Sequence, residues 1–596
     1  MSTRLEMDRE TQKNIDSWLE GSYDESAKNE IRRLQRENPQ ELIDAFYQRL
    51  DFGTGGLRGI MGVGTNRMNV YTVRAATQGL ANYINLQPKT KERHAVLVGF
   101  DTRNHSKEFA EEVAKVLGAN NIEVYLYNEM RPVALISFGV LHKKCIAGVM
   151  ITASHNPKEY NGYKVWWQDG VQVLPPHDQG IIQEVNKIID PSQVKSGPLA
   201  SSIIHPISEE IDEAYVTTVR NLQLHPGDNR SKGKQLKIVY TSIHGGGITM
   251  VPRVLSDWGF KNVTLVERQC RADGNFPTVK HPNPEEPEAL TLGIDKLEES
   301  KGDLLIATDP DCDRLAAVIS HQGNHVILNG NETACIALEY ICQSLEEARG
   351  MPPKAMFIKT IVTTELFKAI AKHHRGICLD VLTGFKYIGE KIAQWEEDKQ
   401  GNVTPHHYIF GGEESYGALY GTHARDKDAV VYAAILCEAA LHLKAQGKTL
   451  VDELHRIYHK YGVFREKLLS LEFEGKEGIA KIASMMESLR KNPPAQIANR
   501  AVATIEDYRN HTLLHVASGK KETLVLPKSN VLRFWLEDQT KIVVRPSGTE
   551  PKLKIYVATY KKHFLADEKS LEKAIHSCDR HAEEVLNHVK QIFNAK

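Results

Sequence analysis

Apolar, strand-like runs alternate with helical runs along most of this 596-residue chain, and this alternation constrains its fold more than any other feature. The run AVLVGFD (95–101) is followed by the helical SKEFAEEVAKVLGAN, then by NIEVYLYNE (121–129) and, after another helical stretch, by IAGVMITASHN (146–156). Repeated strand–helix–strand units of this kind predict α/β architecture with mostly parallel sheets.

The alternation restarts twice, which predicts three α/β units. The last part of the chain differs, because TLVLP, VLRFWLED, KIVVRPSG and LKIYVATY are closely spaced strands without intervening helices. They predict an α+β unit with an antiparallel sheet and a C-terminal helix. We therefore expect a helical N-terminal extension and four domains: 1–40, 41–210, 211–330, 331–465 and 466–596.

The charge balance argues against several classes of partner. Lysine and arginine total 75 and aspartate and glutamate total 76, so no global basic field favours nucleic acid or an anionic membrane. The N-terminus is charged and lacks the apolar core of a signal peptide, and the most apolar stretch, VVYAAILCEAALHL, is interrupted by Glu438. The eight cysteines show no CxxC spacing. These features predict a cytoplasmic protein.

The first chemically informative loop follows the strand that ends near residue 151. It reads Thr-Ala-Ser-His-Asn-Pro, with Ser154 at the strand exit and His155 beside it. Asn161-Gly162 is the preferred dipeptide of a two-residue hairpin turn, which would fold the next strand back and bring Lys164 toward Ser154. A serine hydroxyl with such neighbours can carry a phosphoryl or an acyl group.

The second loop, DPDCDR, places three carboxylates directly after the strand LLIAT. In an extended loop, residues two apart share a face, so Asp309, Asp311 and Asp313 can converge. Three adjacent carboxylates repel one another unless a cation lies among them, and hard oxygen ligands suit Mg²⁺. The loop lacks the spacing of an EF-hand calcium site.

Two further loops contain residues that can bind a sugar and an anion, respectively. GGEESYG follows the strand HHYIF, where Glu413 and Ser415 can hydrogen-bond vicinal hydroxyls. RPSGTEPK lies between two strands, where Arg545 offers a bidentate fork and the glycine lets backbone amides line an anion nest. The glycines around Arg58 suit a flexible loop that carries this arginine to an anion. Together the loops point to phosphoryl transfer on a sugar.

This set of motifs, in this order, resembles the α-D-phosphohexomutase superfamily, and within it the longer phosphoglucomutases that grade into phosphopentomutases. The resemblance covers about residues 45–596. It implies three mixed α/β domains and a C-terminal α+β domain around a central cleft, a phosphoserine at Ser154, and one Mg²⁺ held by that phosphate with Asp309, Asp311 and Asp313. It further implies catalytic roles for His155, Lys164 and Arg58. The substrate-binding residues that it implies are Arg314, Lys386, Glu413, Ser415, Arg545, Ser547, Gly548, Thr549 and Lys552.

The resemblance implies that the protein converts glucose 1-phosphate into glucose 6-phosphate through glucose 1,6-bisphosphate, acting as a monomer or weak homodimer. Phosphopentomutase and phosphomannomutase are the alternatives on the same scaffold. Outside the family, LLIATDPDCDR also resembles the loop of a phosphatase with an aspartyl nucleophile, and a sugar-phosphate sensor is a third class. Cys312 departs from the small residue that the family often has in the metal loop, and its redox sensitivity stays open.

Overall fold

The computed structural model describes residues 7–52, 56–89, 92–398, 405–473, 475–547, 552–562 and 567–594. The chain divides into two compact units. The first unit comprises 1–329, 388–408 and 415–442, and the second comprises 330–387, 409–414 and 443–596. Within the described residues, no helix combines the length and the apolar character that crossing a membrane requires.

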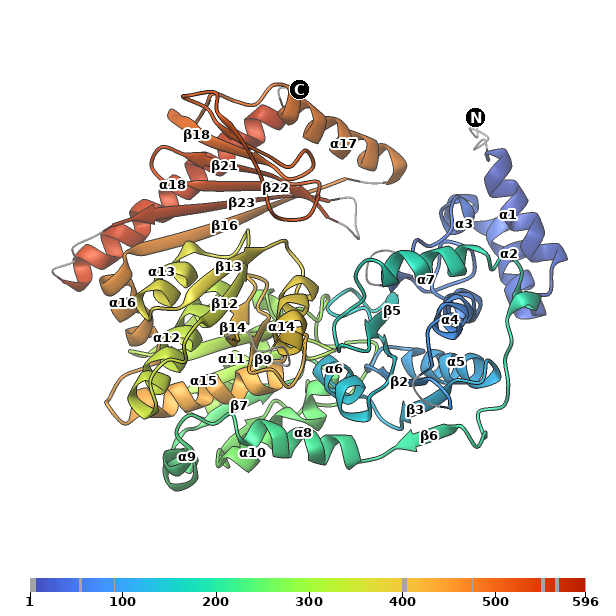
Figure 1. Ribbon diagram of the computed structural model, residues 1–596, viewed down its shortest axis with the longest axis horizontal. Coiled ribbons are helices and arrows are strands. Elements are labelled where there is room, and N and C mark those ends of the chain that lie inside the picture. The colour runs from blue at the N-terminus through green and yellow to red at the C-terminus, as the bar shows by residue number, and fades with distance from the viewer. Residues whose placement is uncertain are drawn as a thin grey trace. The chain divides into compact units, whose positions relative to one another are not determined.

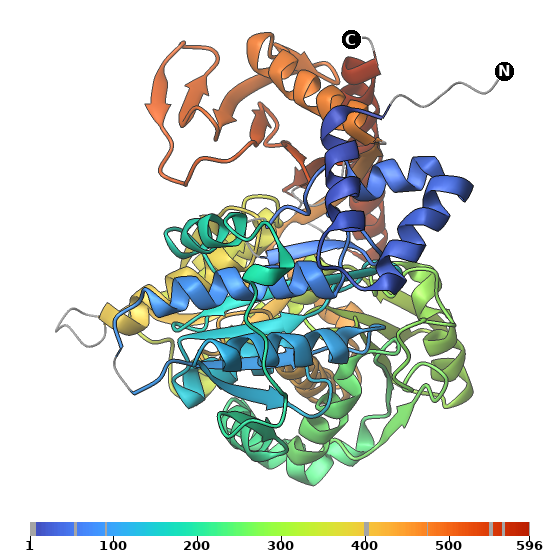
Figure 2. The same cartoon turned by 90° about the vertical axis from the view of Figure 1, so that its right-hand side faces the viewer.

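The first unit begins with three short helices, α1 (Arg9–Glu20), α2 (Glu25–Glu37) and α3 (Pro39–Phe46). They form a small helical bundle (Figure 2). The bundle has a core of its own, in which the rings of Trp18 and Tyr23 stack 4.1 Å apart. Tyr71 of the following helix joins this core and donates a 2.7 Å hydrogen bond to Asp24. The segment 9–46 is therefore mainly helical and packs on the α/β part that follows it, whereas the predicted bounds of the extension, 1–40, stay a prediction.

The first sheet has six strands. In spatial order they are β1 (Gly56–Ile60), β5 (Tyr160–Trp167), β4 (Ala147–Ile151), β2 (Ala95–Phe100), β3 (Glu123–Tyr127) and β6 (Ile204–Ile207). Its helices are α4 (Val70–Asn85), α5 (Ser106–Ala119), α6 (Val133–Lys143) and α7 (His177–Asn186). Side chains alternate across a strand, so β2 presents Val96 and Val98 to the core that includes α5, while Leu97 contacts Gly139 of α6 on the other face.

The second sheet, also in the first unit, has five strands. In spatial order they are β11 (Asn324–Leu328), β10 (Leu315–His321), β9 (Leu304–Thr308), β7 (Ile238–Thr241) and β8 (Val263–Leu265). The helices of this region are α8 (Glu210–Arg220), α9 (Pro226–Lys232), α10 (Val251–Trp258) and α11 (Pro287–Glu299).

The first two sheets are more mixed than expected. Strands β2, β3, β4 and β6 run parallel, but β5 and β1 are antiparallel additions, and β10 and β11 are antiparallel additions to β7, β8 and β9. For β5, β10 and β11 the cause is the short connection, because parallel neighbours need a long crossover whereas a tight loop returns the chain antiparallel. Strand β1 instead pairs with β5 from a distant part of the chain. The loops that join β4 to β5 and β9 to β10 contain Ser154 and the three aspartates, respectively.

The third sheet has four strands, β13 (Ile377–Val381), β12 (Ala355–Thr360), β14 (His407–Gly412) and β15 (Ala418–Tyr420). The helices of this region are α12 (Gly330–Ala348), α13 (Glu365–His373), α14 (Lys386–Asp398), α15 (Ala429–Lys444) and α16 (Leu450–Tyr461).

The fourth sheet lies in the second unit, and its neighbouring strands within the described residues run antiparallel, as predicted. Its order is β16 (Val463–Glu472), β23 (Lys552–Lys561), β22 (Lys541–Pro546), β21 (Leu532–Leu536), β18 (Arg500–Asp507), β19 (Thr512–His515) and β20 (Lys521–Thr523), with β17 (Gln496–Ile497) paired to β18. Helices α17 (Gly475–Lys491) and α18 (Glu568–Asn594) complete it, and Figure 1 shows α18 running along the sheet. The α/β and α+β classes are thus confirmed, whereas the arrangement around a central cleft and the domain boundaries stay predictions.

Candidate active site

Ser154 lies at the strand exit that the sequence predicts, three residues after the end of β4. Its φ of +52° is in the left-handed region, which is unfavourable for a residue with a Cβ and is often found at functional sites. The hydroxyl donates a 3.0 Å hydrogen bond to Asp309 Oδ2 and lies 3.2 Å from His155 Nδ1. The side chain that could carry a group therefore touches the acidic loop directly.

A buried arginine that sequence reasoning missed holds the serine loop in shape. Arg103 donates to the carbonyls of Ser154 and Asn156, both at 2.5 Å, and its Nε lies 3.4 Å from Asp101 Oδ2. Burial lowers the pKa of Arg103 to about 10. The available signal was the charged DTR segment directly after the fully apolar strand β2.

The dipeptide Asn161-Gly162 does not form the predicted hairpin turn, because both residues lie inside β5. The Asn161 side chain donates to Asn104 O and Ser106 Oγ, and a Cβ on Gly162 would lie 2.5 Å from Thr152 O. Close packing explains this dipeptide better than turn preference. The longer serine loop makes the return, and β5 is antiparallel to β4 as expected.

The three aspartates of the second loop converge, as the sequence predicts. One carboxylate oxygen from each of Asp309, Asp311 and Asp313 lies within 4.8 Å of the other two, and all three residues are buried. Among the described residues, Asp311 Oδ1 and Asp313 Oδ1 accept no hydrogen bond. We call these residues the carboxylate triad. Buried carboxylate oxygens without donors fit a hard divalent cation such as Mg²⁺.

The members of the carboxylate triad have different electrostatic surroundings. Burial and the neighbouring Asp313 and Asp311 raise the pKa of Asp309 well above its usual range. Burial acts in the same direction on Asp311, but the ammonium of Lys164 outweighs it and holds the pKa of that carboxyl below its usual range. Negative charge is therefore less favourable at Asp309, the residue that contacts Ser154, than at Asp311.

Two lysines contact the carboxylate triad. Lys164 Nζ lies 2.8 Å from Asp311 Oδ2. Strand β5, which runs antiparallel to β4, therefore brings Lys164 to the acidic loop. Lys427, which sequence reasoning missed, lies 3.1 Å from Asp313 Oδ2. A Cβ on Gly417 would lie 2.1 Å from Lys427 Cδ, so the glycine of GGEESYG makes room for this lysine. The charged segment ARDKD after β15 was the signal for it.

The predicted arginines lie near these two loops. The backbone amide of Arg314 donates to Asp309 Oδ1 at 3.0 Å, while its guanidinium pairs with Glu285. Arg58 donates to Asn156 Oδ1 at 3.0 Å, next to the serine loop. The expectation of a flexible loop around Arg58 is wrong, because this residue lies in β1, paired with Gly162.

Cys312 lies in the acidic loop with a φ of +55° and is fully buried. Burial and nearby carboxylates, Asp309 first, raise its thiol pKa well above the usual range. The thiolate is the reactive form, so these surroundings disfavour oxidation.

The sugar-loop residues divide between the two units. In the second unit, Glu413 is buried and accepts a 3.0 Å hydrogen bond from the backbone amide of Gly384. Lys386 begins α14 two residues later, with its ammonium 5.5 Å from the ring of Tyr387. The structure thus brings together two segments that the family resemblance links to substrate. Ser415 belongs to the first unit and is half-buried.

The predicted anion loop is the hairpin that joins β22 to β23. Arg545 pairs with Lys554 in the ladder, and the Ser547 amide donates to Lys552 O at 2.7 Å. Lys552 Nζ lies 2.9 Å from Glu472 Oε1. Gly548 and Thr549 lie outside the described residues, so their part in the nest stays a prediction.

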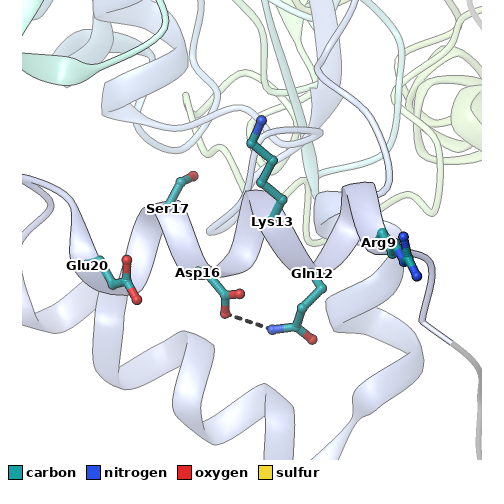
Figure 3. Close-up of a pocket in the computed structure, with 6 residues that line it drawn as sticks. All are labelled: Arg9, Gln12, Lys13, Asp16, Ser17 and Glu20. Atoms are coloured by element: carbon teal, nitrogen blue, oxygen red, sulfur yellow. Dashed lines mark hydrogen bonds between the residues drawn. The ribbon is translucent and has the colours of Figure 1, made fainter.

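A shallow hollow on α1 contains none of the predicted site residues. Figure 3 shows its lining, which comes from this single helix: Arg9, Gln12, Lys13, Asp16, Ser17 and Glu20. Its polar, mostly exposed side chains converge on no enclosed volume, so it is a surface feature of the N-terminal bundle.

Comparison with known proteins decides the family. Residues 49–191, 213–323 and 329–461 match alpha/beta/alpha domains I, II and III, respectively, of the phosphoglucomutase/phosphomannomutase family. The chain belongs to the phosphoglucomutase/phosphomannomutase family. Phosphoglucomutases of Staphylococcus aureus strains MSSA476 and USA300 are 35% and 36% identical to it, over 92% and 91% of this chain and 96% and 94% of theirs.

Solved structures of family members share the fold. A putative phosphomannomutase from Thermus thermophilus superposes with a TM-score of 0.63 at 20% identity, covering 90% of this chain and 99% of its own. Parafusin, a phosphoglucomutase from Paramecium, gives 0.61 at 15% identity, covering 91% and 96%. The shared fold therefore extends over most of the chain, and the three matched domains together with the Staphylococcus relatives confirm the predicted resemblance.

Proposed function

We propose that this protein is a phosphoglucomutase that interconverts α-D-glucose 1-phosphate and glucose 6-phosphate through a phosphoserine at Ser154. The single observation that carries the proposal is the 3.0 Å contact between Ser154 Oγ and Asp309 of the carboxylate triad. It places the predicted phosphoryl carrier against the predicted metal ligands. The Staphylococcus relatives named as phosphoglucomutases support the choice of glucose.

Asp309, Asp311 and Asp313, together with the phosphate on Ser154, would hold one Mg²⁺. Bound Mg²⁺ supplies charge neutralisation to the phosphoryl oxygens, which is what phosphoryl transfer needs most. Arg103 keeps the serine loop in its strained shape through the Ser154 and Asn156 carbonyls. Arg58 and Arg314 would add positive charge beside the transferring group.

Lys164 is our candidate for moving the proton of the reacting sugar hydroxyl. Asp311 holds its ammonium at 2.8 Å, which fixes the donor in place. His155, whose Nδ1 lies 3.2 Å from Ser154 Oγ, would orient the serine oxygen. The phosphoserine would give its group to glucose 1-phosphate and be restored from the resulting glucose 1,6-bisphosphate after that intermediate turns over.

The remaining predicted residues would hold the sugar and the phosphate that is not reacting. Glu413 and Ser415 would bind the O3 and O4 hydroxyls, which lie between the two phosphorylated ends and so suit both orientations. Lys386 would face the substrate. The phosphate would be held by Arg545, Ser547, Gly548, Thr549 and Lys552.

The finer expectations on organisation are part of the same proposal. We propose the domain boundaries given above, a cytoplasmic location, a monomer or weak homodimer, and no nucleic-acid or membrane partner. Glucose 1,6-bisphosphate would act as both intermediate and activator.

The test offers glucose 1-phosphate, mannose 1-phosphate and ribose 1-phosphate in parallel, with Mg²⁺ and a trace of bisphosphate, and follows the products by ³¹P NMR. Fastest conversion of glucose 1-phosphate to the 6-phosphate supports the proposal. Preference for ribose or mannose phosphate keeps the mechanism and changes the substrate. Release of inorganic phosphate without isomerisation would contradict a mutase and favour the phosphatase alternative.

A further inference from the structure

Strand β22 presents two kinds of side chain to its two faces. Ile542 and Val544 belong to the core that α18 covers, whereas Val543 packs with Ile361 and Val362, which follow β12. Because side chains alternate along a strand, Lys541 and Arg545 share the face of Val543. At about 3.3 Å per residue, about 13 Å of rigid strand separates Lys541 from Arg545.

Lys541 is anchored at one end of this face. Its side chain is only 2% exposed, and its Nζ donates to Thr363 O at 2.7 Å and to Glu365 Oε1 at 2.8 Å. Thr363 lies in the turn between β12 and α13, and Glu365 is the first residue of α13, so the contact joins the fourth sheet to the third within the second unit.

The charged side chains around Lys541 include equal numbers of positive and negative groups. Glu365 also faces Lys359 at 2.9 Å, and Asp380 faces Lys359 at 3.1 Å and Arg533 at 3.3 Å. Arg533 in turn pairs with Glu506 at 2.7 Å. We call this set the anchor cluster, and its members are Lys359, Lys541, Arg533, Glu365, Asp380 and Glu506.

The turn that receives Lys541 also contacts the sugar loop. Thr363 Oγ1 lies 3.4 Å and Thr360 Oγ1 lies 3.3 Å from Glu414 Oε2, and the two hydroxyls are 2.9 Å apart. Glu414 is the direct neighbour of Glu413. One short turn therefore separates the Lys541 anchor from the loop that carries a proposed sugar ligand.

We propose that Lys541 is a positioning residue that fixes the spacing between the phosphate-binding hairpin at Arg545 and the sugar-binding loop at Glu413. This inference rests on the proposed function, because it takes both segments to be substrate contacts. A phosphosugar touches both segments at once, so its affinity depends on their spacing being set beforehand. Inorganic phosphate is too small to span the two segments, so its affinity is indifferent to that spacing.

The experiment compares wild type with Lys541→Met and with Lys541→Met/Glu365→Gln, the second of which removes one charge of each sign. For each we measure KM and kcat for glucose 1-phosphate, and the inhibition constant of inorganic phosphate. We expect KM for the sugar phosphate to rise about tenfold in both variants. The phosphate inhibition constant should stay within about twofold.

A matched control loses a buried ion pair that lies within the fourth sheet's own region. The Arg490 side chain is 6% exposed, and it lies 3.2 Å from Asp507 and 2.6 Å from Asn530. Arg490→Met should lower the melting temperature but leave KM for glucose 1-phosphate within about twofold, because it links neither segment to the other.

Thr363→Val supplies an independent test if the lysine variants do not fold. It keeps the carbonyl that accepts from Lys541 and removes the hydroxyl that faces Glu414. We expect KM to rise about threefold, corresponding to one net hydrogen bond.

Two outcomes would overturn the inference. One is an unchanged KM in every folded variant, and the other is an equal loss of affinity for glucose 1-phosphate and inorganic phosphate. Arg545→Met separates this failure from failure of the proposed function. If that variant binds inorganic phosphate as wild type does, the hairpin is not the phosphate site; if it binds phosphate more weakly while Lys541→Met/Glu365→Gln leaves KM unchanged, only the positioning role is wrong.

Discussion

The two units each bury a cluster of charges, but the clusters are built differently. In the carboxylate triad of the first unit, three carboxylates lie within 4.8 Å of one another and two of their oxygens accept no hydrogen bond within the described residues. Two lysines face these three carboxylates. In the anchor cluster of the second unit, three cationic side chains face three carboxylates, each of which has a lysine or arginine nitrogen within 3.3 Å. Asp380 Oδ1 accepts no hydrogen bond from any described residue but lies 3.1 Å from Lys359 Nζ.

This difference distinguishes a metal-binding or reactive site from a cluster that only stabilises the fold. Three buried carboxylates beside two lysines leave an excess of negative charge, which costs free energy and is sustained only where a cation or a reaction needs it. In a cluster with equal numbers of positive and negative charges, the charged groups pair with one another, and the cluster links the elements that carry them. Burial alone does not distinguish the two, because Asp309 and Lys541 are both almost fully inaccessible.

The largest effect is expected at the serine. Ser154→Ala should lower mutase turnover by about 10³-fold or more, because it removes the phosphoryl carrier. Circular dichroism should show an unchanged fold. The matched control is Ser320→Ala, which loses a 2.8 Å hydrogen bond to Gly302 O outside the site and should retain activity. Retained turnover in Ser154→Ala would refute the phosphoserine assignment.

The next effect tests the carboxylate triad. Asp309→Asn should lower activity by about 10²-fold, because a metal ligand becomes neutral. Without Mg²⁺, the same change should stabilise the protein by about 1 kcal/mol or more, because it removes a charge that burial and two aspartates disfavour. Thermal melting with and without Mg²⁺ measures both the stability and the metal dependence.

The control for Asp309→Asn is Asp295→Asn on the exposed side of α11, which should change neither the activity nor the stability without Mg²⁺. Mg²⁺ should raise the melting temperature of wild type and of this control, and should have little effect on Asp309→Asn. Destabilisation of metal-free Asp309→Asn would show that the triad is a balanced structural cluster.

Neutralising a carboxylate of the anchor cluster should change the stability of the protein in the opposite direction. Asp380→Asn should destabilise the protein by about 2 kcal/mol, because Lys359 and Arg533 each lose a charged partner. The loss should be the same with and without Mg²⁺, and urea unfolding measures it. A stabilised Asp380→Asn would remove the distinction between the two clusters.

The smallest effect concerns pH. Burial disfavours a charged His374, but its hydrogen bond to Glu339 and its ion pair with Glu346, at 3.0 Å each, raise its pKa above the ordinary value of 6.5. A raised folded-state pKa gives stability that is complete below the unfolded value and is lost as pH rises through the folded value.

His374→Gln should therefore cost about 1 kcal/mol below pH 6.5, and the cost should shrink as pH rises. Chemical unfolding at a series of pH values gives the difference between the two proteins. A cost that is independent of pH would mean that His374 acts only by packing.

The sequence predicts Ser154 and the carboxylate triad well because each follows an uninterrupted apolar strand, so the side chains at the strand end are placed locally. It misses Lys427 and the anchoring of Lys541, because these depend on contacts between distant segments. Lys541 and its partner Glu365, for example, are 176 residues apart. At Asn161-Gly162 a local turn preference is overridden by tight packing against Thr152 and Leu57.

The most direct test of the account is to find the atom that carries the phosphoryl group. The protein is incubated with glucose 1,6-bisphosphate labelled with ³²P, quenched in acid and digested, and the labelled residue is identified by mass spectrometry. Ser154 Oγ and Asp309 Oδ2 are only 3.0 Å apart, so geometry alone leaves either oxygen within reach of the same phosphorus. The account predicts an acid-stable label on Ser154 that Ser154→Ala abolishes; a hydroxylamine-sensitive label on Asp309 would contradict it.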